Sequence, residues 1–368
     1  METMNESEQY KKIKFLASES SPNCSIFLVQ DKSSGKIYLQ KEVKASSFEL
    51  SKIYENEYLQ SNYLNSNINF IHIIDIFYSN DKQSLIIITE YIQATLLKAI
   101  NSKLKQKSYF SEYSILEFFT QICLCIKSYH DNNIIYRNID PNKIYIANGN
   151  IVKLGDSIDI KSLVCADEKA ITYTGFDLYL SPEILIGHPY SFKSDIWSLG
   201  VLLFHLMGLN YPFTINDLSM MKNIKKFDKK KILSKLPKHY SKYMKTLVDK
   251  LLNFEPLNRP DITTIVNYLY DKYFAFNSVI KIGYRPWITM LNEICHKKLS
   301  KSDGVIKNHG NNHKSLFESS DSIKKYANRN QKIIGLDSTY RPNEIIGDTK
   351  IEVDVDSISN MSNKIQYE

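Results

Sequence analysis

A short polar stretch at residues 136–144, YRNIDPNKI, gathers side chains that could do chemistry. Arg137 and Lys143 supply cations, Asp140 a carboxylate and Asn138 an amide. An amide cannot accept a proton from a hydroxyl group as a carboxylate can. An ammonium group has no lone pair to offer a metal ion and would repel it. Among these four side chains, only Asp140 could act as a base.

Other blocks of sequence surround this stretch in a fixed order. They are, along the chain, residues 35–43 (GKIYLQKEV), 136–144, 153–158 (KLGDSI), 180–183 (LSPE), 195–200 (DIWSLG) and 258–260 (NRP). In this order the blocks resemble the motifs of protein kinases. Four stretches are similar in sequence to the NIMA-related serine/threonine kinases: residues 119–124 (FTQICL), 153–156, 179–183 and 194–200.

The resemblance implies an α+β, bilobal protein-kinase-like fold with a small β-rich N-lobe, a larger helical C-lobe and a C-terminal tail. The expected parts are an N-terminal extension at 1–9, the N-lobe at 10–92, the C-lobe at 93–275 and a polar, largely disordered tail at 276–368.

Apolar periodicity predicts the elements of both lobes. Strands are expected within residues 10–45 and at 70–78 and 84–91. Helices are expected at 48–64, 112–131, 194–209 and 261–273, with Lys-rich helices in 214–252. Ser111 has the residue type of an N-cap for the helix at 112–131.

The resemblance also assigns roles to single residues. Lys41 would contact nucleotide phosphates and pair with a helix glutamate, for which Glu55 and Glu57 are both candidates. Asp156 would bind metal. The remaining assignments are Thr89 as gatekeeper, Glu90 and Ile92 in the hinge between lobes, Arg137 in the catalytic loop, Glu183 and Arg259 as a buried structural pair, and Asp195 as an acceptor for backbone N–H groups of the catalytic loop.

Several positions depart from the family pattern. Asn138 replaces the catalytic aspartate, Asp140 replaces a phosphate-binding lysine, and Lys143 replaces the second metal ligand. The stretch that should form the phosphate loop, residues 16–26, contains no glycine. Ser157 and Ile158 stand where Phe and Gly follow the metal-binding aspartate, and Phe176 replaces a threonine. We hypothesise that Lys143 pairs with Asp156 as an internal substitute for metal.

These changes favour a catalytically impaired kinase-like domain, a pseudokinase, acting as a protein-binding scaffold or allosteric regulator. The alternative is a weak or atypical ATP-dependent serine/threonine kinase, supported by Lys41, Asp156 and Arg137. ATP binding is expected to be weak or absent, and Mg²⁺ binding impaired. We expect protein partners, without nucleic acid or membrane, and a cytoplasmic location that the resemblance extends to nucleus or cytoskeleton. The net charge of +7 is modest, and no run of about 18 apolar residues is present.

Overall fold

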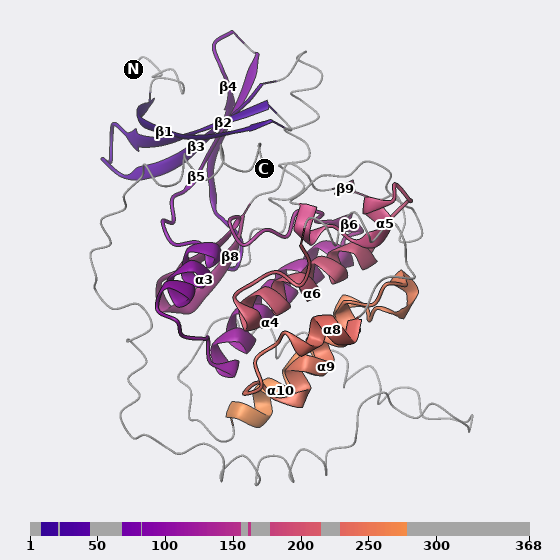
Figure 1. The fold of residues 1–368 in the computed structure, drawn as a ribbon. Coiled ribbons are helices and arrows are strands. Elements are labelled where there is room, and N and C mark those ends of the chain that lie inside the picture. The colour runs from indigo at the N-terminus through magenta and orange to yellow at the C-terminus, as the bar shows by residue number, and fades with distance from the viewer. Residues whose placement is uncertain are drawn as a thin grey trace, which may run out of the picture. The chain divides into compact units, whose positions relative to one another are not determined.

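The computed structural model describes residues 9–20, 23–44, 68–81, 83–155, 161–162, 177–214 and 229–277 (Figure 1). All of them belong to one compact unit, residues 1–310, and a second unit comprises residues 311–368. The predicted helix at 48–64 with Glu55 and Glu57, the predicted positions Asp156, Ser157, Ile158 and Phe176, and the tail beyond 277 lie outside the described residues.

The N-terminal part is a five-stranded antiparallel sheet in the order β1-β2-β3-β5-β4. Its strands are β1 (Tyr10–Ser20), β2 (Asn23–Asp31), β3 (Ile37–Lys44), β4 (Ile73–Tyr78) and β5 (Ser84–Glu90). Strand β5 lies between β3 and β4 and is buried from Leu85 to Thr89, as its apolar run predicts. Lys41 on β3 lies between Ile26 of β2 and Ile87 of β5.

The C-terminal part is mainly helical (Figure 1). Its helices are α3 (Leu96–Lys105), α4 (Glu112–Asp131), α5 (Pro182–Leu185), α6 (Phe192–Gly208), α8 (Lys229–Ser234), α9 (Lys242–Leu251) and α10 (Ile262–Asn277). Ser111 caps α4, because its Oγ accepts a hydrogen bond from the Ser114 N–H at 3.1 Å. Gly200 lets α6 approach α9 closely, since a Cβ there would lie 2.8 Å from the Leu251 Cβ. The predicted helices at 112–131, 194–209 and 261–273 are therefore present.

Short elements complete this part. They are the strands β6 (Ile134–Ile135), β7 (Ile144–Ala147), β8 (Ile151–Leu154) and β9 (Lys161–Ser162), and the 3₁₀ turns at Asn148–Asn150, Asp177–Tyr179 and Pro256–Asn258. Strands β6 and β9 form one two-stranded ladder, and β7 and β8 form another. The helices in the described residues all lack the combined length and hydrophobicity that a membrane crossing needs.

A buried polar cluster joins the sheet to the helical part. The Asn69 side-chain amide donates to the Val152 carbonyl at 2.7 Å and to Gln121 Oε1 at 2.9 Å. The same Gln121 oxygen accepts the Val152 N–H at 2.9 Å, and the Asn69 carbonyl accepts the Leu154 N–H at 2.8 Å. Buried polar groups that satisfy one another in this way fix a single arrangement. The cluster therefore anchors the segment before β4 to α4 and β8. This architecture confirms the predicted α+β fold with its N-terminal sheet and helical C-terminal part.

Candidate functional site

A cavity of about 310 Å³ lies where the sheet meets the helical part. Leu16, Ala17, Ile26, Leu39 and Ile71 give it apolar walls. The rest of its lining is Lys41, Thr89, Glu90, Tyr91, Ile92, Gln93, Thr95, Lys98, Asn142, Lys143, Tyr145 and Gly155. A concave, mostly apolar pocket with a few convergent polar groups is the usual form of a small-molecule site. The structure thus brings together Lys41, Thr89, Glu90 and Ile92, which the sequence assigned to nucleotide binding.

The segment between β5 and α3 is held by Glu90. Its Oε1 forms an ion pair with Lys153 Nζ at 2.5 Å and accepts the His72 N–H at 2.7 Å. Thr89 is 1% exposed, and its hydroxyl donates to the Glu90 carbonyl at 3.3 Å. The Glu90 carboxylate is consequently neutralised by Lys153.

Three ammonium groups line the cavity. Lys41 is 7% exposed and comes from β3, while Lys143 comes from the loop before β7. The third, Lys98 of α3, donates to the Gln93 carbonyl at 2.9 Å, and burial lowers its pKa. The sequence-based assignment missed Lys98 and Asn142. The signal for Lys98 was Thr95 three residues before it, whose hydroxyl accepts the Lys98 N–H at 3.3 Å as the N-cap of α3.

The loop at residues 136–143 is held from below by Asp195. One carboxylate oxygen accepts the Arg137 N–H at 2.8 Å, and the other accepts the Tyr136 N–H at 2.9 Å and lies 2.8 Å from His130 Nε2. Arg137 adopts φ 67°, a conformation that non-glycine residues seldom take without support. The role assigned to Asp195 from the sequence, that of an acceptor for backbone N–H groups of this loop, is present in the structure.

The three loop residues that depart from the family pattern, Asn138, Asp140 and Lys143, have different surroundings. Asn138 is 6% exposed and Lys143 lines the cavity, whereas Asp140 is absent from the cavity lining. The Asp140 carboxylate accepts the Asn142 N–H at 2.8 Å. Burial raises the pKa of Tyr211, and the negative charge of Asp140 raises it further.

Gly155, the residue before Asp156, is held against the backbone of Lys143. Its N–H donates to the Lys143 carbonyl at 2.7 Å. A Cβ at this position would lie 2.6 Å from the same carbonyl oxygen, closer than real Cβ atoms come. The Gly155 carbonyl in turn accepts the Tyr136 hydroxyl at 3.0 Å. The hypothesised contact between Lys143 and Asp156 lies outside the described residues and stays a hypothesis.

The stretch expected to form the phosphate loop lies in strands β1 and β2, which pair as an antiparallel hairpin with two register shifts. Their register runs from Tyr10 opposite Asp31 to Ser20 opposite Asn23, leaving residues 21–22 between the strands. A glycine-rich loop brings backbone N–H groups close to phosphate because it lacks side chains. This hairpin instead presents side chains, and Leu16 and Ala17 line the cavity.

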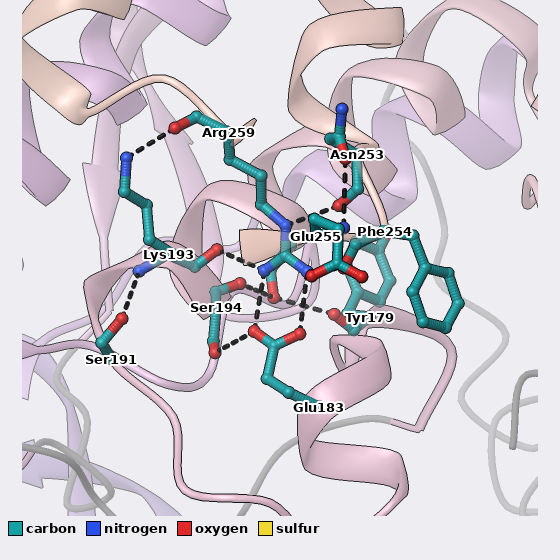
Figure 2. Close-up of polar contacts among 10 residues, drawn as sticks. Tyr179, Glu183, Ser191, Lys193, Ser194, Asn253, Phe254, Glu255 and Arg259 are labelled. Carbon is teal, nitrogen blue, oxygen red and sulfur yellow. Dashed lines mark hydrogen bonds and ion pairs between the residues drawn. The ribbon is translucent and has the colours of Figure 1, made fainter. Parts of the chain in front are cut away.

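Arg259 and Glu183 form the buried pair shown in Figure 2. Two Arg259 nitrogens donate to the two Glu183 oxygens at 2.7 and 2.8 Å. The remaining donors reach the carbonyls of Asn253, Phe254 and Lys193, so all five guanidinium N–H groups are used. Burial raises the pKa of Glu183, but the hydrogen bonds and charge of Arg259 outweigh it and the pKa is lowered. This network fixes α5 against the turn at Pro256–Asn258.

A two-lobed fold with a cleft between sheet and helices, a loop braced by Asp195 and the Glu183–Arg259 pair together define a protein-kinase-like chain. The model of the protein kinase domain family matches residues 22–271, and the chain belongs to this family. The match begins after β1, the strand that enters the expected phosphate loop.

Individual relatives show which protein kinases this chain is similar to. The chain is 34% identical to the serine/threonine-protein kinase Nek1 of Mus musculus over 59% of its own length and 17% of the relative. It is 33% identical to Nek5 of Mus musculus, over 63% of this chain and 38% of the relative. It is 30% identical to the probable serine/threonine-protein kinase nek3 of Dictyostelium discoideum, over 80% and 26%. The similarity confirms the predicted NIMA-related resemblance, and the chain spans well under half the length of these relatives.

Proposed function

We propose that this chain is a catalytically impaired protein kinase-like domain, a pseudokinase, that acts as a protein-binding scaffold or allosteric regulator. Asn138 carries the proposal. Asp195 keeps the loop of Asn138 in place through two backbone hydrogen bonds, yet the side chain offered there is an amide. The hydrogen bonds that support the loop are thus kept, whereas the reactive carboxylate is replaced by the amide of Asn138.

The chemistry of neighbouring residues supports the same reading. Loss of a general base lowers the rate by about 10²–10⁴. Asp140 is a poor replacement, because it lies outside the cavity lining and its carboxylate accepts the Asn142 N–H. Lys143 brings an ammonium group to the position of a metal ligand. The described residues thus hold no carboxylate at the usual place of the base.

The cavity suits a nucleotide better than a divalent cation. The walls formed by Ile26, Leu39 and Ile71 fit an aromatic base, and Lys41 and Lys143 are placed to face phosphates. Mg²⁺ prefers carboxylate oxygen ligands, and the described carboxylate of the lining, Glu90, is paired with Lys153, while Asp156 is outside the described residues. We therefore propose weak ATP binding with a reduced need for Mg²⁺.

A weak or atypical serine/threonine kinase is the second candidate. Lys41, buried beside the cavity, favours it, because this lysine is the phosphate contact of active relatives. The family to which the chain belongs uses ATP and Mg²⁺ in general. The two candidates differ in whether phosphate is transferred.

Phosphotransfer from labelled ATP separates these candidates. The full chain should transfer no more label to itself or to a generic protein substrate than the Lys41→Ala control. The double variant Asn138→Asp/Lys143→Asn should gain activity if the cavity still holds ATP. Wild-type transfer that Lys41→Ala abolishes would establish the kinase reading instead.

A thermal shift with ATP, with and without Mg²⁺, tests the cavity itself. A ligand that binds only the folded state raises the midpoint by mass action. We expect a shift that does not require Mg²⁺ and that Lys143→Ala reduces. A shift seen only with Mg²⁺ would contradict the role given to Lys143.

A further inference from the structure

The positive charge of this chain is concentrated on one short segment. Residues 229–250 contain eight lysines and one acid, Asp249, a net charge of +7 that equals that of the whole chain. The other 346 residues are therefore balanced between positive and negative side chains. A compositional excess of lysine alone would spread the charge along the chain.

The fold gathers these lysines on the surface of α8, α9 and the loop between them. Lys229 Nζ forms an ion pair with Asp249 Oδ1 at 2.9 Å, which joins α8 to α9. Lys245 Nζ donates to the Lys238 carbonyl at 3.3 Å, which joins the loop to α9. Figure 1 shows α8 and α9 side by side, and the two helices are in contact. We call this surface, marked by the exposed Lys230, Lys238 and Lys242, the α8–α9 basic face.

Two of the lysines of α9, Lys242 and Lys245, lie where a positive charge is unfavourable to the helix dipole. The positive end of a helix dipole is its N-terminus, so cations there are unfavourable and acids favourable. Helix α9 has Lys242 and Lys245 in its first turn and no acid of its own there, although the Glu112 carboxylate of α4 accepts the N–H of its N-cap Ser241 at 2.9 Å. The opposite face of α9, with Met244, Leu247 and Val248, is buried in the core. Packing therefore explains the apolar positions of α9 and does not explain the exposed Lys242.

We propose that the α8–α9 basic face docks an acidic segment of a partner protein, one rich in aspartate and glutamate. Lysines act as point charges that attract carboxylates without fixed geometry, and residues 229–250 contain no arginine for bidentate phosphate recognition. The same residues present no exposed large apolar side chain for insertion into a membrane. The inference holds whether or not the cleft transfers phosphate.

The test measures binding of a short labelled polyglutamate peptide to the full chain by fluorescence anisotropy. The variant Lys230→Glu/Lys238→Glu/Lys242→Glu should bind at least about tenfold more weakly, since exposed pairs contribute a few tenths to one kcal/mol each and 1.4 kcal/mol is a factor of ten. The control Lys11→Glu/Lys32→Glu/Lys36→Glu makes the same charge change on exposed lysines of the sheet and should alter binding less than about twofold.

Folding and partner class are checked in parallel. The unfolding midpoint of Lys242→Glu should stay close to that of wild type, because Lys242 is exposed and its charge contributes little to stability. If the triple glutamate variant unfolds, the triple Lys→Gln variant replaces it. Equal loss in both charge-reversed sets, or no loss in either, would overturn the docking face. Tighter wild-type binding to duplex DNA or to phosphatidylserine vesicles than to the peptide would overturn the choice of an acidic protein.

Discussion

Glu183→Gln should strongly destabilise the fold by removing one charge from the buried pair with Arg259. The substitution keeps the shape of the side chain but leaves the guanidinium, whose side chain is 0% exposed, without its counter-charge. Breaking a buried pair from one side costs about 3–5 kcal/mol. In a domain of this size about 1 kcal/mol lowers the melting temperature by about 2–4 °C, so a fall of about 6–20 °C follows.

The assay is thermal unfolding of the full chain followed by circular dichroism. Arg259→Met should be destabilising too, because it orphans Glu183 and three backbone carbonyls. The double variant Glu183→Leu/Arg259→Met should lose less than the sum of the two single changes, since no lone charge remains. A Glu183→Gln protein within about 1 kcal/mol of wild type would refute this account of the pair.

Three further predictions concern other contacts. Gly155→Ala should cost about 1–3 kcal/mol, because its Cβ would meet the Lys143 carbonyl at 2.6 Å, and chemical denaturation measures it. Asp195→Asn should cost about 2–3 kcal/mol in the same assay, since one acceptor oxygen of the loop brace becomes a donor. Burial lowers the pKa of His205 to about 4 from 6.5. The unfolded chain then binds the proton first, so stability should fall by about 2 kcal/mol between pH 7 and pH 5, and His205→Gln should remove that loss.

Long periodic segments were predictable from the sequence, because their signals are local. The Ser111 cap and the apolar pattern placed α4, and the apolar run of β5 identified a buried strand. Helix α3 was missed, although Thr95 and the spacing of Leu96 and Ile100 were available as signals. The two-residue strands β6 and β9 could not be predicted, since their pairing depends on segments far apart in sequence.

The residue types of the site could be predicted better than the directions in which their side chains point. The resemblance to protein kinases assigned both Lys41 and Thr89 to the nucleotide site, and both line the cavity. The sequence put Asp140 at the position of a phosphate-binding lysine, whereas the structure leaves it out of the cavity lining, with its carboxylate accepting the Asn142 N–H. Lys98 joins the cavity through the start of α3, which periodicity alone could not orient toward the cavity. A side chain's direction in a loop depends on hydrogen bonds that only the folded backbone defines.

The buried cluster around Asn69 has a consequence for how ligands enter the cleft. Among the described residues, the sheet is tied to the helical part by the chain segment after Glu90, by the ion pair of Glu90 with Lys153, and by the hydrogen bonds of Asn69 with Gln121 and Val152. A body held along one line can rotate about that line more easily than it can slide. Opening should therefore resemble the swing of a door, widest at the β1–β2 hairpin and smallest at Asn69. Amide hydrogen exchange at Leu154 should stay slow even when the cleft is open, because the Leu154 N–H remains hydrogen-bonded to the Asn69 carbonyl.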